Sequence, residues 1–262
     1  MPRPIVTLIT DFGLSDHFVG VMKGVILGIA PNAEIVVITH QITPYEIPEA
    51  GFVLAETYRW FPKKTVHVVV VDPGVGTLRR PVLAEAAGQY FIAPDNGVLS
   101  LVYAREKHKV RAITAEKLFL KPVSDTFHGR DIFAPCAAHL AKGLSPARLG
   151  KLITDYCRLE FYRPVRTGKR IWSGRILKVD RFGNLITNFH ISEFPVVRTR
   201  PFSLVAGQQE VTRLARTFAD VTPGEVFAIV GSSGYLEIVA NQGSAARMTG
   251  SSAGAPAELT IY

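Results

Sequence analysis

The sequence predicts an α/β fold in which an N-terminal domain with a mostly parallel sheet flanked by helices precedes a smaller, strand-rich domain. In the first half of the chain, strand-like apolar runs alternate with segments of helical periodicity. Residues 65–71 contain almost no polar side chain, which is typical of a strand covered on both faces of a parallel sheet. After about residue 155, short β-like runs separated by Gly, Pro, Asn and Ser replace this alternation.

The first strand is expected at residues 4–10 and ends at Asp11-Phe12-Gly13. We expect Ser15 or Asp16 to cap the helix that follows, because a short oxygen side chain satisfies free N–H groups of a first turn. The helical spacing of apolar residues continues to Ile29 and stops before Pro31. The later elements expected in this half are a strand at 34–39, a helix at 48–60, a strand at 65–71, a strand pair at 81–93 and a helix at 130–142.

The C-terminal region predicts a small barrel or sandwich. We place the N-terminal domain at residues 1–157, a linker at 158–170 and the C-terminal domain at 171–262. Residues 248–256 are expected to form a flexible surface loop, since Gly, Ser, Ala and Pro dominate them. The strands expected here lie at 169–179, 185–189, 203–205, 226–230, 235–240 and 257–261.

Composition limits the class of protein. No apolar run approaches the roughly 18–20 residues needed to span a bilayer, and the first residues do not resemble a signal peptide. The two cysteines, Cys136 and Cys157, are too few for a disulfide framework or a thiolate zinc site. We therefore expect a soluble cytoplasmic protein with no membrane partner, no metal and no cofactor.

The charge balance raises the possibility of a nucleic-acid partner. Thirty Lys and Arg against 22 Asp and Glu leave a formal net charge of +8. The charges are scattered, and the densest cluster, residues 105–111, has no interleaved aromatic side chains for base stacking. We interpret the cluster as a solvated face and expect no nucleic-acid partner. The competing hypothesis predicts polynucleotide binding with a steep salt dependence.

Two acidic residues follow predicted strands. Asp11 ends the first strand and Asp72 ends the third, and ligands of open parallel sheets bind at these carboxyl ends. A single strand-end Asp is more often a helix cap or a turn residue. Two on neighbouring strands make a ligand site as good an explanation as a structural role, and a carboxylate there could accept both hydroxyls of a ribose.

The segment from Asp72 to Arg80 is rich in glycine but lacks the spacing of a dinucleotide or P-loop motif. Its Pro-Gly turn instead returns an arginine toward Asp72, although a surface arginine pair would give the same pattern. His128 precedes the helix expected at 130–142; a histidine there is more often structural than catalytic. The absence of a cysteine partner argues against a metal, and no Gly-x-Ser-x-Gly elbow supports a serine hydrolase.

Polar turns recur in the second half, at residues 180–184 and 231–237. Either could be ordinary hairpin chemistry, and the second could also offer hydroxyls and backbone amides to a carboxylate. Together with the segments above, these turns form a set of motifs that follow one another along the chain. The motifs are Thr10-Asp11-Phe12-Gly13, Asp72-Pro73-Gly74-Val75-Gly76-Thr77, Ala93-Pro94-Asp95-Asn96-Gly97, Phe127-His128-Gly129-Arg130-Asp131-Ile132-Phe133, Phe182-Gly183-Asn184 and Gly231-Ser232-Ser233-Gly234-Tyr235.

As a set, these motifs resemble the S-adenosyl-methionine hydroxide adenosyltransferases, the hydrolytic relatives of the fluorinases and chlorinases. The resemblance runs from Ile5 to about Asn241. It implies a C-terminal β-barrel and a homotrimer, with substrate between the N-terminal domain of one subunit and the C-terminal domain of its neighbour. It also implies the reaction of S-adenosyl-methionine with water to give adenosine and methionine.

The resemblance assigns roles to particular residues. It implies that Asp72, Arg79 and His128 handle the attacking water, that Asp11 binds the ribose and that Tyr45 packs beside the sugar. The residues that it implies around the methionine end are Asp180, Asn184 and Ser232, with Glu237 and Val239 on the strand beside the adenine.

One feature separates the two branches of the superfamily. The halogenating branch lacks the Asp and His of the triad, whereas this sequence has both, so hydrolysis is favoured over halide transfer. Ser233 stands where halogenases typically have Arg, which leaves the partner of the methionine carboxylate open. A halide-using transferase and a non-catalytic binder of S-adenosyl-methionine or adenosine remain the alternatives.

Overall fold

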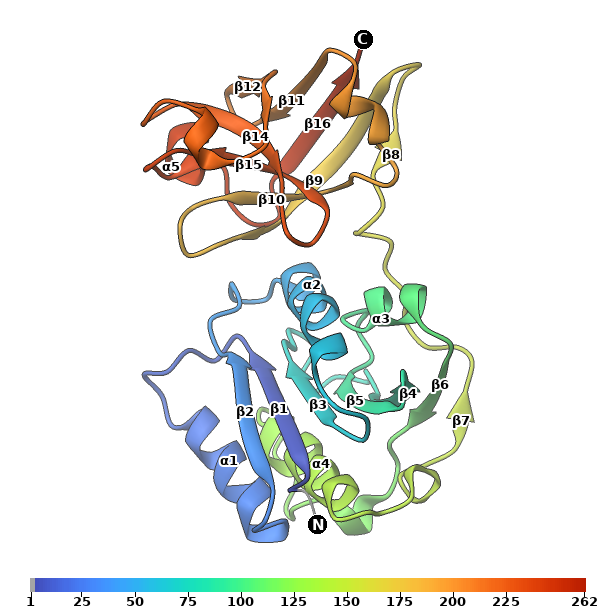
Figure 1. Ribbon diagram of the computed structural model, residues 1–262. Coiled ribbons are helices and arrows are strands. Elements are labelled where there is room, and N and C mark those ends of the chain that lie inside the picture. The colour runs from blue at the N-terminus through green and yellow to red at the C-terminus, as the bar shows by residue number, and fades with distance from the viewer. Residues whose placement is uncertain (1–2) are drawn as a thin grey trace. The chain divides into compact units, whose positions relative to one another are not determined.

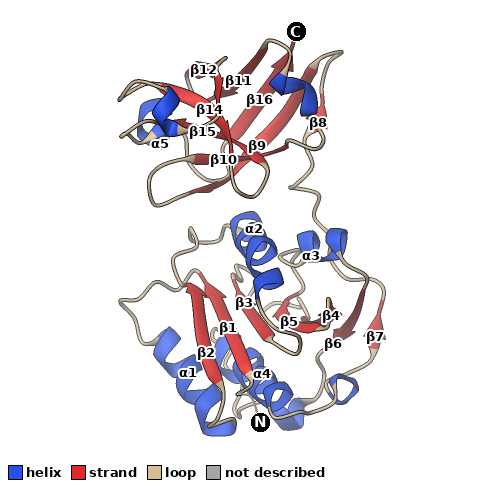
Figure 2. Cartoon of the chain, viewed as in Figure 1, coloured by secondary structure: helices blue, strands red, loops and turns tan. Residues whose placement is uncertain are grey.

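The computed structural model describes residues 3–262, which divide after Leu159 into two compact units (Figures 1 and 2). The division falls inside the expected linker at 158–170. Met1 and Pro2, which belong to the stretch considered above for a signal peptide, lie outside the described residues. No helix among residues 3–262 combines the length and the apolar character that crossing a membrane requires.

The first unit is built on a seven-stranded sheet with the order β2-β1-β3-β5-β4-β6-β7. Its β2, β1, β3 and β5 neighbours pair in parallel, and the pairs that involve β4, β6 and β7 are antiparallel. The strands are β1 (Ile5–Thr10), β2 (Glu34–Thr39), β3 (Val66–Val70), β4 (Pro81–Ala86), β5 (Gln89–Pro94), β6 (His108–Ala112) and β7 (Leu152–Ile153).

The sheet is therefore mixed, and the expectation of a mostly parallel sheet holds only for one side of it. The cause is the connection between β4 and β5, which consists of Ala87 and Gly88, both with positive φ (52° and 75°). A two-residue turn of this kind joins antiparallel strands, because a parallel connection needs a long crossover.

Helices cover both faces of this sheet. Helices α1 (Phe18–Ile29) and α4 (Ala134–Ala141) pack on one face, and α2 (Ile47–Thr57) and α3 (Ser100–Arg105) on the other. Because side chains alternate along a strand, Val68 and Val70 join the first core while Val69 and Val71 join the second. This burial on both faces explains why residues 65–71 are almost wholly apolar.

The helix starts differ from expectation. The residue at the N-cap of α1 is His17, without a side-chain capping bond, and Ser15 Oγ donates to the Asp16 carboxylate. The expected cap was wrong, since both short side chains lie before the cap position. The helix expected at 130–142 begins as a π-helical turn, η3 (Gly129–Phe133), which runs directly into α4. The 3₁₀ turns of this unit are η1 (Tyr58–Trp60), η2 (Glu116–Leu118) and η4 (Pro146–Arg148).

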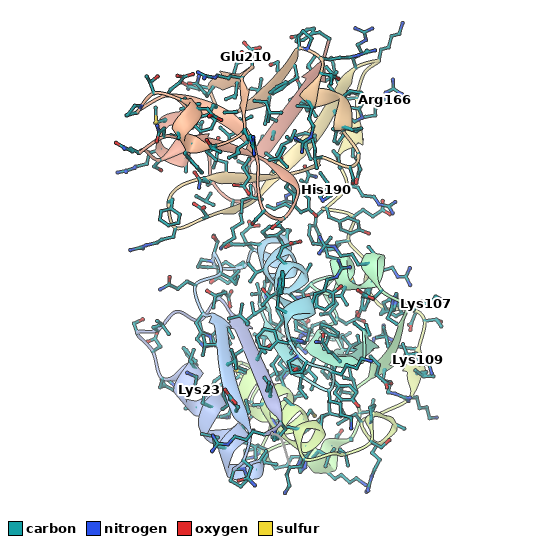
Figure 3. The ribbon with its side chains drawn as sticks, viewed as in Figure 1. Lys23, Lys107, Lys109, Arg166, His190 and Glu210 are labelled. Carbon is teal, nitrogen blue, oxygen red and sulfur yellow. The ribbon has the colours of Figure 1, made fainter. Side chains whose placement is uncertain are left out.

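The charged cluster at residues 105–111 forms the end of α3 and most of β6. Lys107 and Lys109 are exposed beside this strand (Figure 3). Arg105 pairs with Glu56 at 2.7 Å and Arg111 with Glu85 at 3.0 Å. Two of its four cations thus have carboxylate partners, as in an ordinary solvated face.

The second unit is a nine-stranded sheet that curls into a half-barrel around one apolar core. The strands follow the order β12-β11-β16-β9-β10-β15-β14-β13, with β8 beside β9. Strand β12, at one end of this order, contacts β14 near the other end, but no ladder closes the sheet. The strands are β8 (Val165–Arg166), β9 (Ile171–Val179), β10 (Leu185–His190), β11 (Phe202–Ala206), β12 (Gln209–Val211), β13 (Leu214–Ala215), β14 (Val226–Val230), β15 (Tyr235–Ala240) and β16 (Pro256–Ile261).

Two segments that were expected to be irregular contain a helix and a strand. Helix α5 (Ala245–Thr249) occupies the start of the expected loop at 248–256, with Ser244 accepting a hydrogen bond from the Arg247 N–H as its cap. Strand β8 lies within the expected linker and pairs with β9. The 3₁₀ turns η5 (Pro195–Arg198) and η6 (Phe218–Asp220) complete this unit.

Candidate active site

The carboxyl ends of β1 and β3 bring Asp11 and Asp72 to the same edge of the first sheet. The two strands are parallel neighbours, with Thr10 opposite Val70. A cavity of about 330 Å³ opens at this edge, and both aspartates line it together with Tyr45 and His128. This is the position at which open sheets with parallel strands bind ligands.

Asp72 and Arg79 are joined by a tight loop. Its turns are closed by hydrogen bonds from Val75 N to Asp72 O (3.2 Å) and from Thr77 N to Gly74 O (3.1 Å). Arg79 Nε donates to Asp72 Oδ1 at 2.9 Å, and Nη2 donates to Oδ2. The side chains are 9% and 5% exposed, so this is a buried bidentate pair. The Pro-Gly turn returns the arginine to the aspartate, as the sequence predicted.

His128 completes a continuous group with this pair. Its Nδ1 lies 2.7 Å from Arg79 Nη2. Because a guanidinium only donates, Nδ1 accepts, and a neutral imidazole then carries its proton on Nε2. The pKa of His128 is lowered from 6.5, first by burial and then by the neighbouring Arg79 charge. The remaining donor of Arg79, Nη1, is buried and has no partner in the described part of the chain.

Asp11 and Tyr45 form a second polar contact at the cavity. Tyr45 N donates to Asp11 Oδ2 at 3.0 Å, and the Tyr45 side chain is 71% exposed. Tyr45 has a φ of 69°, a costly conformation for a residue with a side chain, which often marks a functional site. Burial raises the pKa of Asp11 above its usual 3.8.

Three aromatic side chains for which the sequence predicted no role in a site also line this cavity. Phe12, Phe18 and Phe127 pack against one another, with ring centroids 5.1–6.1 Å apart. Phe12 and Phe127 belong to motifs that carried the family resemblance, whereas the helical spacing of Phe18 indicated only core packing. These rings give the cavity the apolar surface that a small organic ligand needs.

In the second unit, Asp180 organises the turn between β9 and β10. Its Oδ1 accepts the backbone N–H groups of Phe182 (2.8 Å) and Asn184 (2.9 Å), and its Oδ2 accepts Asn184 Nδ2 at 2.8 Å. Phe182 is 77% exposed at the tip of this turn. The turn thus presents an aromatic ring and a carboxylate on a rigid frame.

The other residues singled out in this unit lie on or near β15. Burial and the charge of Asp180 raise the pKa of Glu237 to about 7, which places these two carboxylates near each other. A Cβ on Gly231 would overlap the Glu237 carboxylate, so the turn before β15 closes directly over it. Ser232 is exposed in the same turn.

Val239 does not share this environment. Its side chain is fully buried and packs with Phe227 and Val221 in a small apolar cluster. A contact with a ligand could therefore come only from its backbone.

The site in the first unit is suited to hold a polar small molecule and a water. It offers a neutral imidazole and two carboxylates on the wall of one cavity, with the Arg79 guanidinium behind them in contact with Asp72 and His128. Among residues 3–262, no group of three or more His, Cys, Asp or Glu side chains is arranged to hold a metal ion.

Fold and site together define a two-unit protein with a small-molecule cavity at the carboxyl edge of its first sheet. Residues 6–150 match the family model of the SAM hydroxide adenosyltransferase N-terminal domain, and residues 174–258 match that of the C-terminal domain. The chain belongs to this family.

Individual relatives agree with this assignment. An (R)-S-adenosyl-L-methionine hydrolase from Thermus thermophilus is 37% identical over 98% of this chain and 99% of its own length. A fluorinase from an Actinoplanes species is 28% identical over 91% of each chain. The crystal structure of an uncharacterized conserved protein from Thermotoga maritima superposes with a TM-score of 0.88, at 40% identity over 98% of this chain and 99% of that one.

Proposed function

We propose that this protein hydrolyses S-adenosyl-L-methionine at the ribose C5′ to give adenosine and L-methionine. The family and the names of its hydrolase relatives support the substrate. The observation that carries the proposal is the continuous Asp72–Arg79–His128 group, whose Asp72 and His128 line the same cavity as Asp11.

Substrate binding starts from Asp11, whose carboxylate accepts the two ribose hydroxyls while Tyr45 N holds one of its oxygens. Tyr45 packs beside the sugar, and the aromatic group of Phe12, Phe18 and Phe127 supplies apolar wall. Because Asp11 and Asp72 follow neighbouring strands, a ribose held by Asp11 has its C5′ within reach of the triad.

The triad holds the attacking water. The Nε2–H of His128, whose tautomer Arg79 fixes, donates to the water oxygen, and the nearby Arg79 charge stabilises hydroxide character as the O–H bond weakens. The oxygen attacks C5′ in line with the C5′–S bond, and the bonding pair leaves with sulfur, which becomes a neutral thioether. The water proton passes to the Asp72 carboxylate and then to solvent. The single acceptor nitrogen of the neutral imidazole, Nδ1, already accepts from Arg79, whereas each Asp72 oxygen keeps a second lone pair.

Halide transfer is the alternative chemistry, and fluorinases are among the relatives. A halide needs a dehydrated pocket lined by N–H donors. Here the Asp72 carboxylate lines the cavity and offers a proton acceptor, which a water nucleophile needs and a halide does not. We therefore favour water as the nucleophile.

We further propose that the functional unit is a homotrimer in which the second unit of a neighbouring subunit completes the site. In support, the cavity of about 330 Å³ lies at the low end of the 300–1,000 Å³ typical of small-molecule sites. It suits the nucleoside part of the substrate. The neighbour would contribute Asp180, Asn184 and Ser232 around the methionine end, and Glu237 with the backbone at Val239 around the adenine.

We extend the sulfonium preference in the relative's name, the (R) epimer, to this protein. Inversion at sulfur exchanges the directions of the methyl and aminocarboxypropyl groups, so a site that fixes both the ribose and the amino acid separates the two epimers.

The decisive experiment is incubation with S-adenosyl-L-methionine in ¹⁸O-water, followed by mass analysis of the products. We expect ¹⁸O in the 5′-hydroxyl of adenosine together with methionine. Methylthioadenosine would mean cleavage at another bond, 5′-halo-adenosine in the presence of halide would mean halide transfer, and unchanged substrate would mean a binder.

A further inference from the structure

The loop that carries Asp72 and Arg79 is held at both ends by one dipeptide. At its start, Asn96 Nδ2 donates to the carbonyl oxygen of Val71 at 2.9 Å. At its end, Asp95 N donates to the carbonyl oxygen of Arg80 at 2.8 Å. Asp95 and Asn96 follow β5 directly, so the neighbouring strand of the sheet supplies both anchors.

A partly buried ion pair between Asp95 and Arg80 strengthens the anchor at the end of the loop. Asp95 Oδ2 accepts from Arg80 Nη2 at 2.9 Å and from Nε at 3.3 Å, and the other Asp95 oxygen accepts Cys157 N at 2.8 Å. The Asp95 side chain is 7% exposed. The Arg80 side chain is 36% exposed, so water competes for these charge-assisted bonds only from the Arg80 side, and less than at a fully exposed pair.

Arg80 has a second acidic partner that lacks these properties. Asp155 accepts from Arg80 Nη1 at 3.1 Å through each of its oxygens, and its side chain is 74% exposed. Exposed pairs of this kind contribute little free energy. The same arginine therefore offers a strong and a weak ion pair for comparison.

The anchor at Arg80 also decides the direction of Arg79. Arg80 precedes Pro81, which restricts it to extended backbone. Successive side chains in extended chain point to opposite sides, so fixing Arg80 on Asp95 turns Arg79 toward Asp72 and His128. Without the anchor, Arg79 would have to hold its position through its contacts with Asp72, His128 and the Phe133 ring alone.

We propose that Asp95 and Asn96 are positioning residues for the hydrolytic reaction, which together close the Asp72–Arg79 loop and orient the Arg79 guanidinium between Asp72 and His128. This proposal rests on the proposed function for its kinetic consequence but not for its geometric one. Neither residue lines the cavity, so both act through the loop.

The test uses Asp95→Ala, Asn96→Ala and the conservative Asp95→Asn, with Asp155→Ala as the matched control on the same arginine. We expect Asp95→Ala and Asn96→Ala to lower kcat on the order of 10²-fold, since displacement of a catalytic group by about 1 Å costs that much. KM should change little, because Asp11 and Tyr45 are untouched. Asp95→Asn, which keeps an acceptor oxygen, should restore part of the loss, and Asp155→Ala should resemble the wild type.

The second readout is the titration of the His128 imidazole by NMR, assigned with His128→Gln. Arg79 lowers the pKa of His128, while Asp72, Asp125 and Asp131 raise it. If Arg79 moves away, the acids remain, so the pKa of His128 should rise in Asp95→Ala and Asn96→Ala but not in Asp155→Ala. A merely structural weakening of the unit would lower its melting temperature without this shift.

The outcomes separate the two proposals. Wild-type kcat and wild-type His128 titration in both alanine variants would overturn the positioning role, as would equal effects of Asp95→Ala and Asp155→Ala. If the protein shows no hydrolysis at all, the proposed function fails, and the titration alone decides whether Asp95 and Asn96 position Arg79. If an alanine variant does not fold, Asp95→Asn carries the test: its kcat must lie below that of the wild type and its His128 pKa above, and an unchanged titration contradicts the role.

Discussion

Arg79 donates through Nη2 to Nδ1 of His128 at 2.7 Å, although 49 residues separate the two along the chain. This contact fixes which nitrogen of the imidazole carries the proton, since the guanidinium cannot accept. It also requires a neutral His128 imidazole, so the contact depends on pH. A protonated His128 would present an N–H to Arg79 in place of a lone pair and would add a second positive charge beside it.

The pH dependence of turnover should follow this condition. The pKa of His128 lies below 6.5, so the neutral form that Arg79 requires persists at neutral pH and is lost only as the pH falls further. We expect kcat/KM to be constant around pH 7 and to fall on the acid side below 6.5, where protonation of His128 and of Asp11, whose pKa is raised, both contribute. His128→Asn keeps an acceptor but cannot titrate, so its acid limb should move to lower pH. An unchanged limb would assign it to another group.

Replacing single members of the triad should reduce turnover more than binding. Asp72→Asn removes the charge that pairs with Arg79, and Arg79→Lys removes the bidentate fork and the free Nη1 donor. We expect kcat to fall about 10²- to 10⁴-fold in each, the usual range for acid–base and electrostatic groups, with smaller changes in KM. Steady-state kinetics check this, with Asp16→Asn as a control at an exposed acid outside the cavity lining. Full activity of Asp72→Asn would contradict the proton transfer assigned here.

Asp11 should act on binding through the ribose hydroxyls. Hydrogen bonds to a charged group contribute roughly 1.5–3 kcal/mol, so Asp11→Asn should raise KM about 10- to 100-fold with a smaller change in kcat. A cycle with the 2′-deoxy substrate makes the test specific, since the deoxy substrate and the variant each remove the same contact. We expect the two losses not to add. Additive losses would place Asp11 away from the sugar.

Local patterns predicted the parts of the site that local chemistry builds. The turn that returns Arg79 to Asp72 follows from Pro73 and Gly74, which favour a tight turn whatever surrounds it. The parallel pairing of β1 and β3 follows from two apolar strands separated by helices, and it brings Asp11 and Asp72 together.

Contacts between distant segments were not visible in the same way. Nothing in the periodicity places His128 on Arg79, and only the family resemblance joined them. Asp95 and Asn96 lie in a motif of the family resemblance, but the sequence assigns them no role. Their partners, the carbonyl oxygens of Arg80 and Val71, lie on other segments of the chain. The sequence did not predict strand β6, because within it only Val110 is both apolar and buried. On β15, burial of both faces in the curled sheet took Val239 into the core.

A buried histidine away from the cavity should make the stability of the first unit depend on pH. His67 is 1% exposed, its Nδ1 lies 2.7 Å from Thr7 Oγ1, and burial lowers its pKa to about 4. The unfolded chain binds the proton near 6.5, so the contribution is complete above pH 6.5 and is lost as the pH falls toward 4. The loss can reach about 3 kcal/mol for this shift.

Denaturant midpoints measured between pH 7 and 4 test this prediction. His67→Asn, which keeps an acceptor for Thr7, should show a shallower decline than the wild type, although His40, whose pKa is also lowered to about 4, keeps part of it. His17→Asn at an exposed position is the matched control and should retain the full slope. If the denaturant midpoints of His67→Asn and the wild type declined equally with falling pH, His67 would have the same pKa in the folded and the unfolded chain.

The distance between the Asp72–Arg79 loop and the segment that carries His128 should depend on Gly76. This residue has a φ of 77°, and a Cβ on it would overlap the carbonyl oxygen of Asp125, three residues before His128. Gly143, at the end of α4, has a φ of 92° with nothing within 4 Å of an added Cβ, so alanine there brings strain without a clash. Both Gly76→Ala and Gly143→Ala should lose about 1 kcal/mol of stability from the left-handed backbone alone. Only Gly76→Ala should also push the Asp72–Arg79 loop from His128 and lower kcat, on the order of 10²-fold. Melting temperatures and kcat measured for both variants separate strain from displacement, and an equal kcat in the two would mean that the distance between these loops does not limit the reaction.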